Sequence, residues 1–143
     1  MGTYLVAFFV SFAMAETLVT HIQRILRASP ELVKPAYRDP DGHPLAGHCY
    51  VGSEVYYHAA GGKEAGLTPY TVRHEGTVHW FLRDSTERII DVTAAQFETP
   101  VPYDGASARG FLTAHPSKRA QIVLDQLAGH TKTGGPRLIE VFD

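Results

Sequence analysis

The chain has 143 residues, 44% of them hydrophobic and 20% charged, and a formal net charge of -2. This is the composition of an ordinary globular domain, and 13 basic residues against 15 acidic ones argue against a nucleic-acid partner. The one cysteine, Cys49, excludes an internal disulfide and any zinc site built from cysteine pairs, and no glycine-rich phosphate loop is present.

The first fifteen residues contain an apolar run, residues 4–15, that ends in a small-residue triplet. A secretory signal would begin with basic residues, and residues 1–3 have none. The run, of about 12 residues, is also short for a bilayer span. We therefore predict that residues 1–15 are an upstream extension or a packed helix, with a signal peptide as the alternative. Residues 16–143 are expected to form a single cytoplasmic domain, without membrane contact unless residues 4–15 insert.

An amphipathic helix is predicted over residues 16–28, because apolar side chains recur at steps of three and four. They are Leu18, Val19, Ile22, Ile25 and Leu26. Ser29 is predicted to cap a short turn over residues 30–34, and the Pro- and Gly-rich residues 35–47 to form a loop.

A second helix is predicted to begin at Cys49 and to end at the glycine pair 61–62. Val51, Val55 and Ala59 share one face of it at intervals of four residues. The only thiol of the chain is thus expected at a helix N-terminus.

A sheet is predicted next, from two runs of aromatic and β-branched residues, 78–83 and 88–92, separated by a short polar loop. Residues 70–73 are a candidate extra strand. After a loop over residues 100–109, a helix with Ser117 as its N-cap is predicted to carry Ala120, Val123, Leu124 and Leu127 on one face, and residues 136–143 are a candidate edge strand. This order of elements indicates an α+β domain, in which the helix that carries the cysteine packs on a small antiparallel sheet.

Three residues form a possible catalytic group: Cys49, His79 and Asp91. At a helix N-terminus, unpaired amides and the helix dipole favour a thiolate and can bind an oxyanion. His79 begins one predicted strand and Asp91 ends the next, so a hairpin can make them neighbours if the register allows. We expect the carboxylate to accept the Nδ1–H of the imidazole and Nε2 to face the thiol.

Three segments resemble a known family: AGHCYVGSEVYYHAAGG around Cys49, RHEGTVHWFLRD around His79, and RIIDVTAAQF around Asp91. Together they resemble the small YunG-like proteins of bacteria and phages. Those are similar to the papain-like superfamily with catalytic order Cys, His, Asp, which includes NlpC/P60 peptidases and transglutaminase-type enzymes. The resemblance covers residues 32–127 and implies a papain-like fold and a triad of these three residues.

The resemblance departs at the oxyanion hole. A papain-type glutamine would lie six residues before the nucleophile, where this chain has His43. We therefore assign His43, His48, Trp80 and Gln96 to the substrate cleft as candidates without fixed roles. Eight histidines are present, but none has the spacing of a helical zinc motif, so we expect no metal and no cofactor.

The predicted function is cysteine-dependent hydrolysis of a protein or peptide substrate, as a protease, isopeptidase or amidase. Since the resemblance includes phage proteins, a host defence protein is one expected target. Two alternatives stay open: a non-catalytic module that binds such a protein, and a glutamine deamidase or transglutaminase-type enzyme. Neither the scissile bond nor the oligomeric state follows from the sequence.

Overall fold

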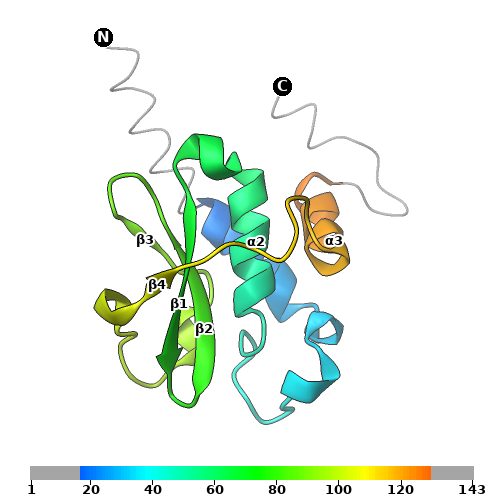
Figure 1. The fold of residues 1–143 in the computed structure, drawn as a ribbon. Helices are drawn as coiled ribbons and strands as arrows, with labels where there is room; N and C mark the ends of the chain where they lie inside the picture. The colour runs from blue at the N-terminus through cyan, green and yellow to red at the C-terminus, as the bar shows by residue number, and fades with distance from the viewer. Residues whose placement is uncertain (1–16, 130–143) are drawn as a thin grey trace.

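The computed structural model describes residues 17–129. A helix that includes residues 17–27 comes first, and two long helices and a four-stranded sheet follow, with short 3-10 turns between them (Figure 1). The elements after the first helix are, in chain order, η1 (Pro30–Leu32), η2 (Pro35–Tyr37), α2 (Cys49–Ala59), η3 (Gly62–Ala65), β1 (Thr68–His74), β2 (Thr77–Arg83), β3 (Ile89–Ile90), η4 (Ala94–Gln96), η5 (Tyr103–Gly105), β4 (Ser107–Ala108) and α3 (Lys118–Leu127). The predicted α+β class is confirmed.

The sheet has the strand order β3-β2-β1-β4, and every pair in it is antiparallel. β1 and β2 form a full-length hairpin through a tight turn at Glu75 and Gly76, both of which have positive φ. β3 pairs only with Leu82 and Arg83 of β2, so the rest of that edge of β2 has no strand partner among residues 17–129. The extra strand predicted at residues 70–73 is thus the main partner of β2.

α2 is the central helix, in contact with β2 on one side and with α3 on the other (Figure 1). Its helical propensity is ordinary, but its first half is buried on nearly every side because both neighbours pack against it. A Cβ at Gly52 would lie 3.2 Å from Leu26 Cδ1 and 3.3 Å from Val92 Cγ1. The glycine therefore lets α2 approach both the first helix and the segment after β3.

The core forms between the helices and one face of the sheet. Its buried apolar members include Ile22, Leu26, Leu45, Val51, Val55, Leu82, Ile90, Val92 and Val123. At about 25 cal/mol per Å² of buried apolar surface, each large aliphatic side chain there contributes roughly 1.5–3 kcal/mol. The apolar stripes predicted for the first helix and for α3 therefore face this core.

A buried carboxylate joins α2 to α3. Glu54 is fully buried and accepts hydrogen bonds from the amide and the hydroxyl of Ser117, both at 2.7 Å. Ser117 is the N-cap of α3, as predicted, and its Oγ accepts from the amide of Ala120 at 3.2 Å. Since the start of a helix carries a partial positive charge, the Glu54 carboxylate is placed where that charge stabilises it.

The structure corrects two local predictions. Ser29 precedes η1 but makes no capping hydrogen bond with its side chain. The segment 100–109 is not all loop, since it contains η5 and β4, which pairs with β1. Such a two-residue strand carries too few residues for a periodic signal.

Two predictions fall elsewhere. The extension 1–15 and the edge strand 136–143 lie outside the described residues. Within residues 17–129, no helix is both long enough and apolar enough to span a membrane.

Candidate active site

Cys49 is the first residue of α2, so its thiol lies at the N-terminus of the helix as predicted. The sulfur is 3.8 Å from the backbone carbonyl oxygen of Val78, to which the thiol can donate a hydrogen bond. Val78 belongs to the stretch of β2 that β3 leaves unpaired. The thiol is partly exposed, and the first amides of the helix beside it have no acceptor within the helix.

The turn that leads into the helix depends on a glycine. Gly47 has a φ of +82°, and a Cβ there would lie 2.6 Å from Val33 Cγ1, well inside van der Waals contact. Any other residue would be strained by its backbone and would collide with the loop after η1. Gly47 therefore fixes the path of the chain two residues before Cys49.

His79 and Asp91 are brought together by the sheet register. Leu82 pairs with Ile90, so the next step of the register places Asp91 on the same face of β2 as Phe81 and His79. The ring Nε2 of His79 lies 2.7 Å from Oδ2 of Asp91. The side chains are 0% and 4% exposed, respectively, so this is a buried pair.

The ring nitrogens of His79 have the opposite roles to those predicted. Nε2, rather than Nδ1, meets the carboxylate of Asp91, while Nδ1 is buried and has no hydrogen-bond partner among the described protein groups. The carboxylate lies diagonally across the strand pair, where the far nitrogen of the ring reaches it more readily than Nδ1, which is close to the backbone. In the neutral tautomer that donates to Asp91, Nδ1 is left with a lone pair.

The pKa of His79 reflects both its burial and its neighbours. Burial acts to lower it, but the hydrogen bond to Asp91 and the contact with the Cys49 side chain outweigh burial and raise the pKa to about 9. The Cys49 sulfur lies 3.8 Å from the carbonyl oxygen of Val78, the residue before His79, so the thiol lies beside the strand that carries the imidazole. Cys49, His79 and Asp91 are therefore neighbours in the fold.

The sequence analysis missed a fourth member of this group, Tyr103. Its hydroxyl donates to the same Oδ2 of Asp91 at 2.7 Å, and the amide of Thr93 donates to Oδ1 at 3.2 Å. Burial raises the pKa of the Tyr103 hydroxyl, and so does the Asp91 carboxylate. Tyr103 lies in a 3-10 turn twelve residues after Asp91, and no pattern in the sequence connects the two.

Aromatic rings enclose the imidazole. Phe97 meets the His79 ring edge-on at a centroid distance of 4.7 Å, and Phe81 stacks on it at 6.2 Å. The segment that carries Phe97 is held by the β1–β2 turn: the Glu75 carboxylate accepts from the amide of Thr99 at 2.9 Å, and His74 Nε2 lies 3.0 Å from the Thr99 hydroxyl. The β1–β2 turn thus positions the segment that carries Phe97 beside the imidazole.

A groove of about 1040 Å³ opens beside Cys49. Tyr50 and Trp80 give it an aromatic wall, with their ring centroids 4.8 Å apart. His79 is not part of the lining, so the Cys49 sulfur is the reactive atom of the trio that faces the groove. The lining also includes Lys34, Gly47, Arg73, Gln96, Lys118 and Arg119.

Two of the four cleft candidates line the groove and two do not. Trp80 and Gln96 do, and the amide of Gln96 donates to the Thr93 hydroxyl at 3.0 Å. His43 lies outside the lining because its Nδ1 accepts from the amide of Leu45 and closes a local turn. His48, the N-cap of α2, points into the protein: it is 1% exposed, and neither ring nitrogen has a hydrogen-bond partner among the described groups.

His48 is therefore a buried neutral histidine. Burial lowers its pKa, the charge of Arg119 lowers it further, and Glu31 acts weakly in the opposite direction. It is adjacent to the nucleophile in sequence, but it is separated from the groove by the turn of the backbone.

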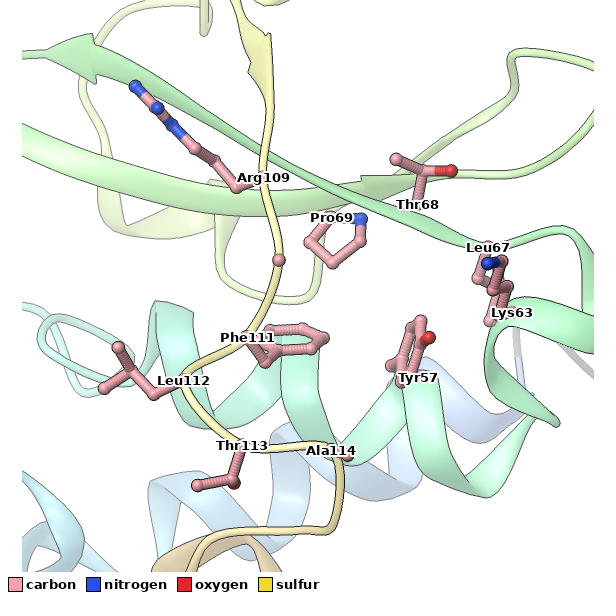
Figure 2. A pocket seen from close by; sticks show the side chains of 11 residues that line it. Tyr57, Lys63, Leu67, Thr68, Pro69, Arg109, Phe111, Leu112, Thr113 and Ala114 are labelled. Carbon is pink, nitrogen blue, oxygen red and sulfur yellow. The ribbon is translucent and has the colours of Figure 1, made fainter.

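A smaller pocket of about 430 Å³ lies between the later part of α2 and β1. Figure 2 shows Phe111, from the segment between β4 and α3, reaching over α2 toward Tyr57, and the two ring centroids are 5.2 Å apart. Cys49 does not line this pocket, and among its lining residues only Lys63 and Arg109 carry a charge. This pocket shares the lining residues Leu112 and Thr113 with the groove, but none of the candidate catalytic residues lines it.

Within residues 17–129, no cluster of three or more histidine, cysteine, aspartate or glutamate side chains has the arrangement of a metal site. Comparison of the chain with protein-family models, with curated proteins and with solved structures finds no significant match.

Proposed function

We propose that this protein is a papain-like, cysteine-dependent hydrolase that acts on a protein or peptide, with Cys49 as nucleophile, His79 as base and Asp91 as the group that orients the base. One observation carries the proposal. A partly exposed thiol at a helix N-terminus opens onto a groove and lies 3.8 Å from the backbone oxygen of Val78, next to His79, whose far ring nitrogen is held by a buried carboxylate. This is the arrangement that activates a cysteine nucleophile.

The first half of the reaction forms an acyl-enzyme. Nδ1 of His79 takes the proton of the Cys49 thiol, and the pKa of about 9 favours this protonated ring at neutral pH. The sulfur attacks the substrate carbonyl carbon, so a C–S bond forms and the carbonyl electrons move to oxygen. When they return, the C–N bond breaks, and the leaving amine takes the proton from His79.

The second half restores the enzyme. His79 accepts a proton from water as the water oxygen attacks the thioester carbonyl. The C–S bond breaks, the sulfur recovers the proton, and the carboxylic acid product leaves. Asp91 orients the His79 ring in both halves, and its carboxylate is itself held by hydrogen bonds from Tyr103 and the Thr93 amide.

The oxyanion would be stabilised at the start of α2. The amide of Cys49 is the first donor, since it is part of the unpaired N-terminal turn. Gln96 supplies a side-chain amide in the same groove, whereas His43, the counterpart of the papain-type glutamine, is committed to Leu45.

The test is turnover of a diverse peptide library by the wild-type chain and by Cys49→Ala, followed by mass spectrometry. Cleavage by the wild type alone, with an acyl-enzyme mass adduct on Cys49, is the expected result. Equal cleavage by both proteins would reject the assignment. Release of ammonia without chain cleavage would instead indicate glutamine deamidation at the same site.

A binding module without catalysis is the competing proposal, and one observation favours it. His79 is fully buried and absent from the groove lining, so a leaving group reaches the ring only past Cys49. Alkylation by iodoacetamide separates the two. A fast reaction near neutral pH that slows in His79→Ala supports the hydrolase, and equal slow rates in both proteins support the binding module.

A further inference from the structure

The groove beside Cys49 has a charge distribution unlike that of the whole chain. The chain carries a net charge of -2, but among residues 17–129 no aspartate or glutamate lines the groove. Four cationic side chains do: Lys34, Arg73, Lys118 and Arg119. Positive charges that line a concave site strengthen the electrostatic potential inside it. An anionic ligand is therefore attracted to the groove, and no lining carboxylate repels it.

These cations are not neutralised by partners. Among residues 17–129, none of the four forms an ion pair with a carboxylate. Arg119 donates to the backbone oxygen of Leu32 at 2.9 Å, which fixes its direction without removing its charge. Lys34, Arg73 and Lys118 are exposed.

Two acidic residues close to the groove lining in sequence, Glu75 and Glu54, hold their hydrogen bonds elsewhere. Glu75, next to the lining residue Gly76, accepts hydrogen bonds from the amides of Glu98 and Thr99. Glu54, below α3, is buried under Ser117. Neither carboxylate lines the groove.

Two helix N-termini add to the same field. α2 begins at Cys49 and α3 begins at Lys118, and both residues line the groove. The unpaired amides of a helix start carry a partial positive charge, although at α3 Glu54 offsets part of it. The cations come from the η1–η2 region, from β1 and from α3, so three separate segments bring positive charge to the groove that Cys49 lines.

We infer that the groove binds an acidic peptide segment, with aspartate or glutamate residues flanking the bond presented to Cys49. The inference deepens the proposed function and rests on it for the bond-breaking step only. The aromatic wall of Tyr50 and Trp80 accommodates the apolar part of such a peptide, and the four cations hold its carboxylates.

Binding is tested first, in Cys49→Ala, so that catalysis is not required. Fluorescence anisotropy compares a short labelled peptide rich in Asp and Glu with its Asn/Gln isostere and with a single-stranded oligonucleotide of similar length. The acidic peptide should bind roughly tenfold more tightly than the isostere, and the difference should shrink between about 50 and 200 mM salt. Equal binding of the two peptides, or tighter binding of the oligonucleotide, overturns the inference.

Charge variants then locate the effect. The double variant Arg73→Gln with Lys118→Gln should weaken acidic-peptide binding roughly five- to tenfold and leave the isostere unchanged. The double variant Arg24→Gln with Arg27→Gln removes two exposed cations of the first helix that do not line the groove, so it is the charge-matched control and should have no effect. An equal loss in the control would place the effect in the overall charge and reject a local site.

Turnover separates this inference from the proposed function. With active protein, acidic peptides should be cleaved with a lower KM than their isosteres. Acidic-peptide binding without any cleavage would reject the hydrolase and keep the groove assignment. Equal cleavage of acidic peptides and their isosteres would reject the groove assignment and keep the hydrolase.

Discussion

The two faces of β2 do different work. On one, His79 and Phe81 meet Asp91, Tyr103 and Phe97, and the contacts are short hydrogen bonds and ring edges. On the other, Trp80 and Leu82 face α2, and Leu82 belongs to the apolar core.

The difference shows how alternation along one strand separates reactivity from stability. The reactive face is held by directional bonds that fix a single ring orientation. The core face is held by burial, which is strong but not directional. Mutations on the reactive face should therefore lower turnover, and mutations on the core face should lower the free energy of unfolding.

The largest effect is expected on the reactive face. His79→Ala removes the proposed base, so kcat/KM should fall roughly 10²- to 10⁴-fold, the usual contribution of a general base. Circular dichroism and the urea midpoint should show that the fold persists. Unchanged turnover by a folded variant would exclude His79 from the chemistry.

The largest effect on the core face should be thermodynamic. Leu82 is fully buried, so Leu82→Ala should lower the free energy of unfolding by about 2–5 kcal/mol. Urea denaturation measures this loss, and turnover per folded molecule should stay near that of the wild type. A catalytic defect without loss of stability would contradict the division between the faces.

The variant Asp91→Asn should change how the activity of the reactive face depends on pH. The carboxylate is the larger of the two neighbours that raise the pKa of His79 to about 9 against burial, the other being Cys49, so an amide should bring that pKa down. The alkaline limb of kcat/KM, where the ring loses the proton needed by the leaving group, should then move to lower pH, and kcat should fall roughly 10²-fold or more.

The same variant can also be tested by the pH dependence of its free energy of unfolding. A raised pKa stabilises the folded protein fully below the unfolded value of 6.5, and this contribution is lost as pH rises through about 9. The free energy of unfolding should therefore decline from pH 6.5 to 9 in the wild type. In Asp91→Asn this slope should flatten, and an equal slope in both proteins would show that the pair does not set it.

Tyr103→Phe should have the smallest effect and the opposite direction. When the Tyr103 hydroxyl is removed, the Asp91 carboxylate loses one hydrogen-bond donor and stabilises the imidazolium more strongly. The alkaline limb of kcat/KM should therefore move to higher pH. Stability should fall by about 1.5 kcal/mol, the usual value of a hydrogen bond to a charged group. A downward shift of the limb would mean that Tyr103 acts on another group.

The elements with a clear period were predictable. The helix that starts at Cys49, the α3 cap at Ser117 and the antiparallel strands around His79 all follow from local patterns, and so does the α+β class. Asp91 as the neighbour of His79 required only the strand order and the register.

The rest depended on contacts that no local pattern records. Tyr103 meets Asp91 across a turn, and Glu54 meets Ser117 across 63 residues. The nitrogen of His79 that faces Asp91 depends on the diagonal offset between strands, which the sequence does not reveal. The groove charge needed three separate segments to be assembled.

The bond between Glu54 and Ser117 has a mechanical consequence. To widen the groove by tilting α3 away from α2, the protein would have to uncover a carboxylate that is now sealed from water and bound by two donors. Leaving those donors behind would cost several kcal/mol. The two hydrogen bonds therefore oppose separation of α3 from α2, so a substrate is expected to conform to the existing width of the channel it enters.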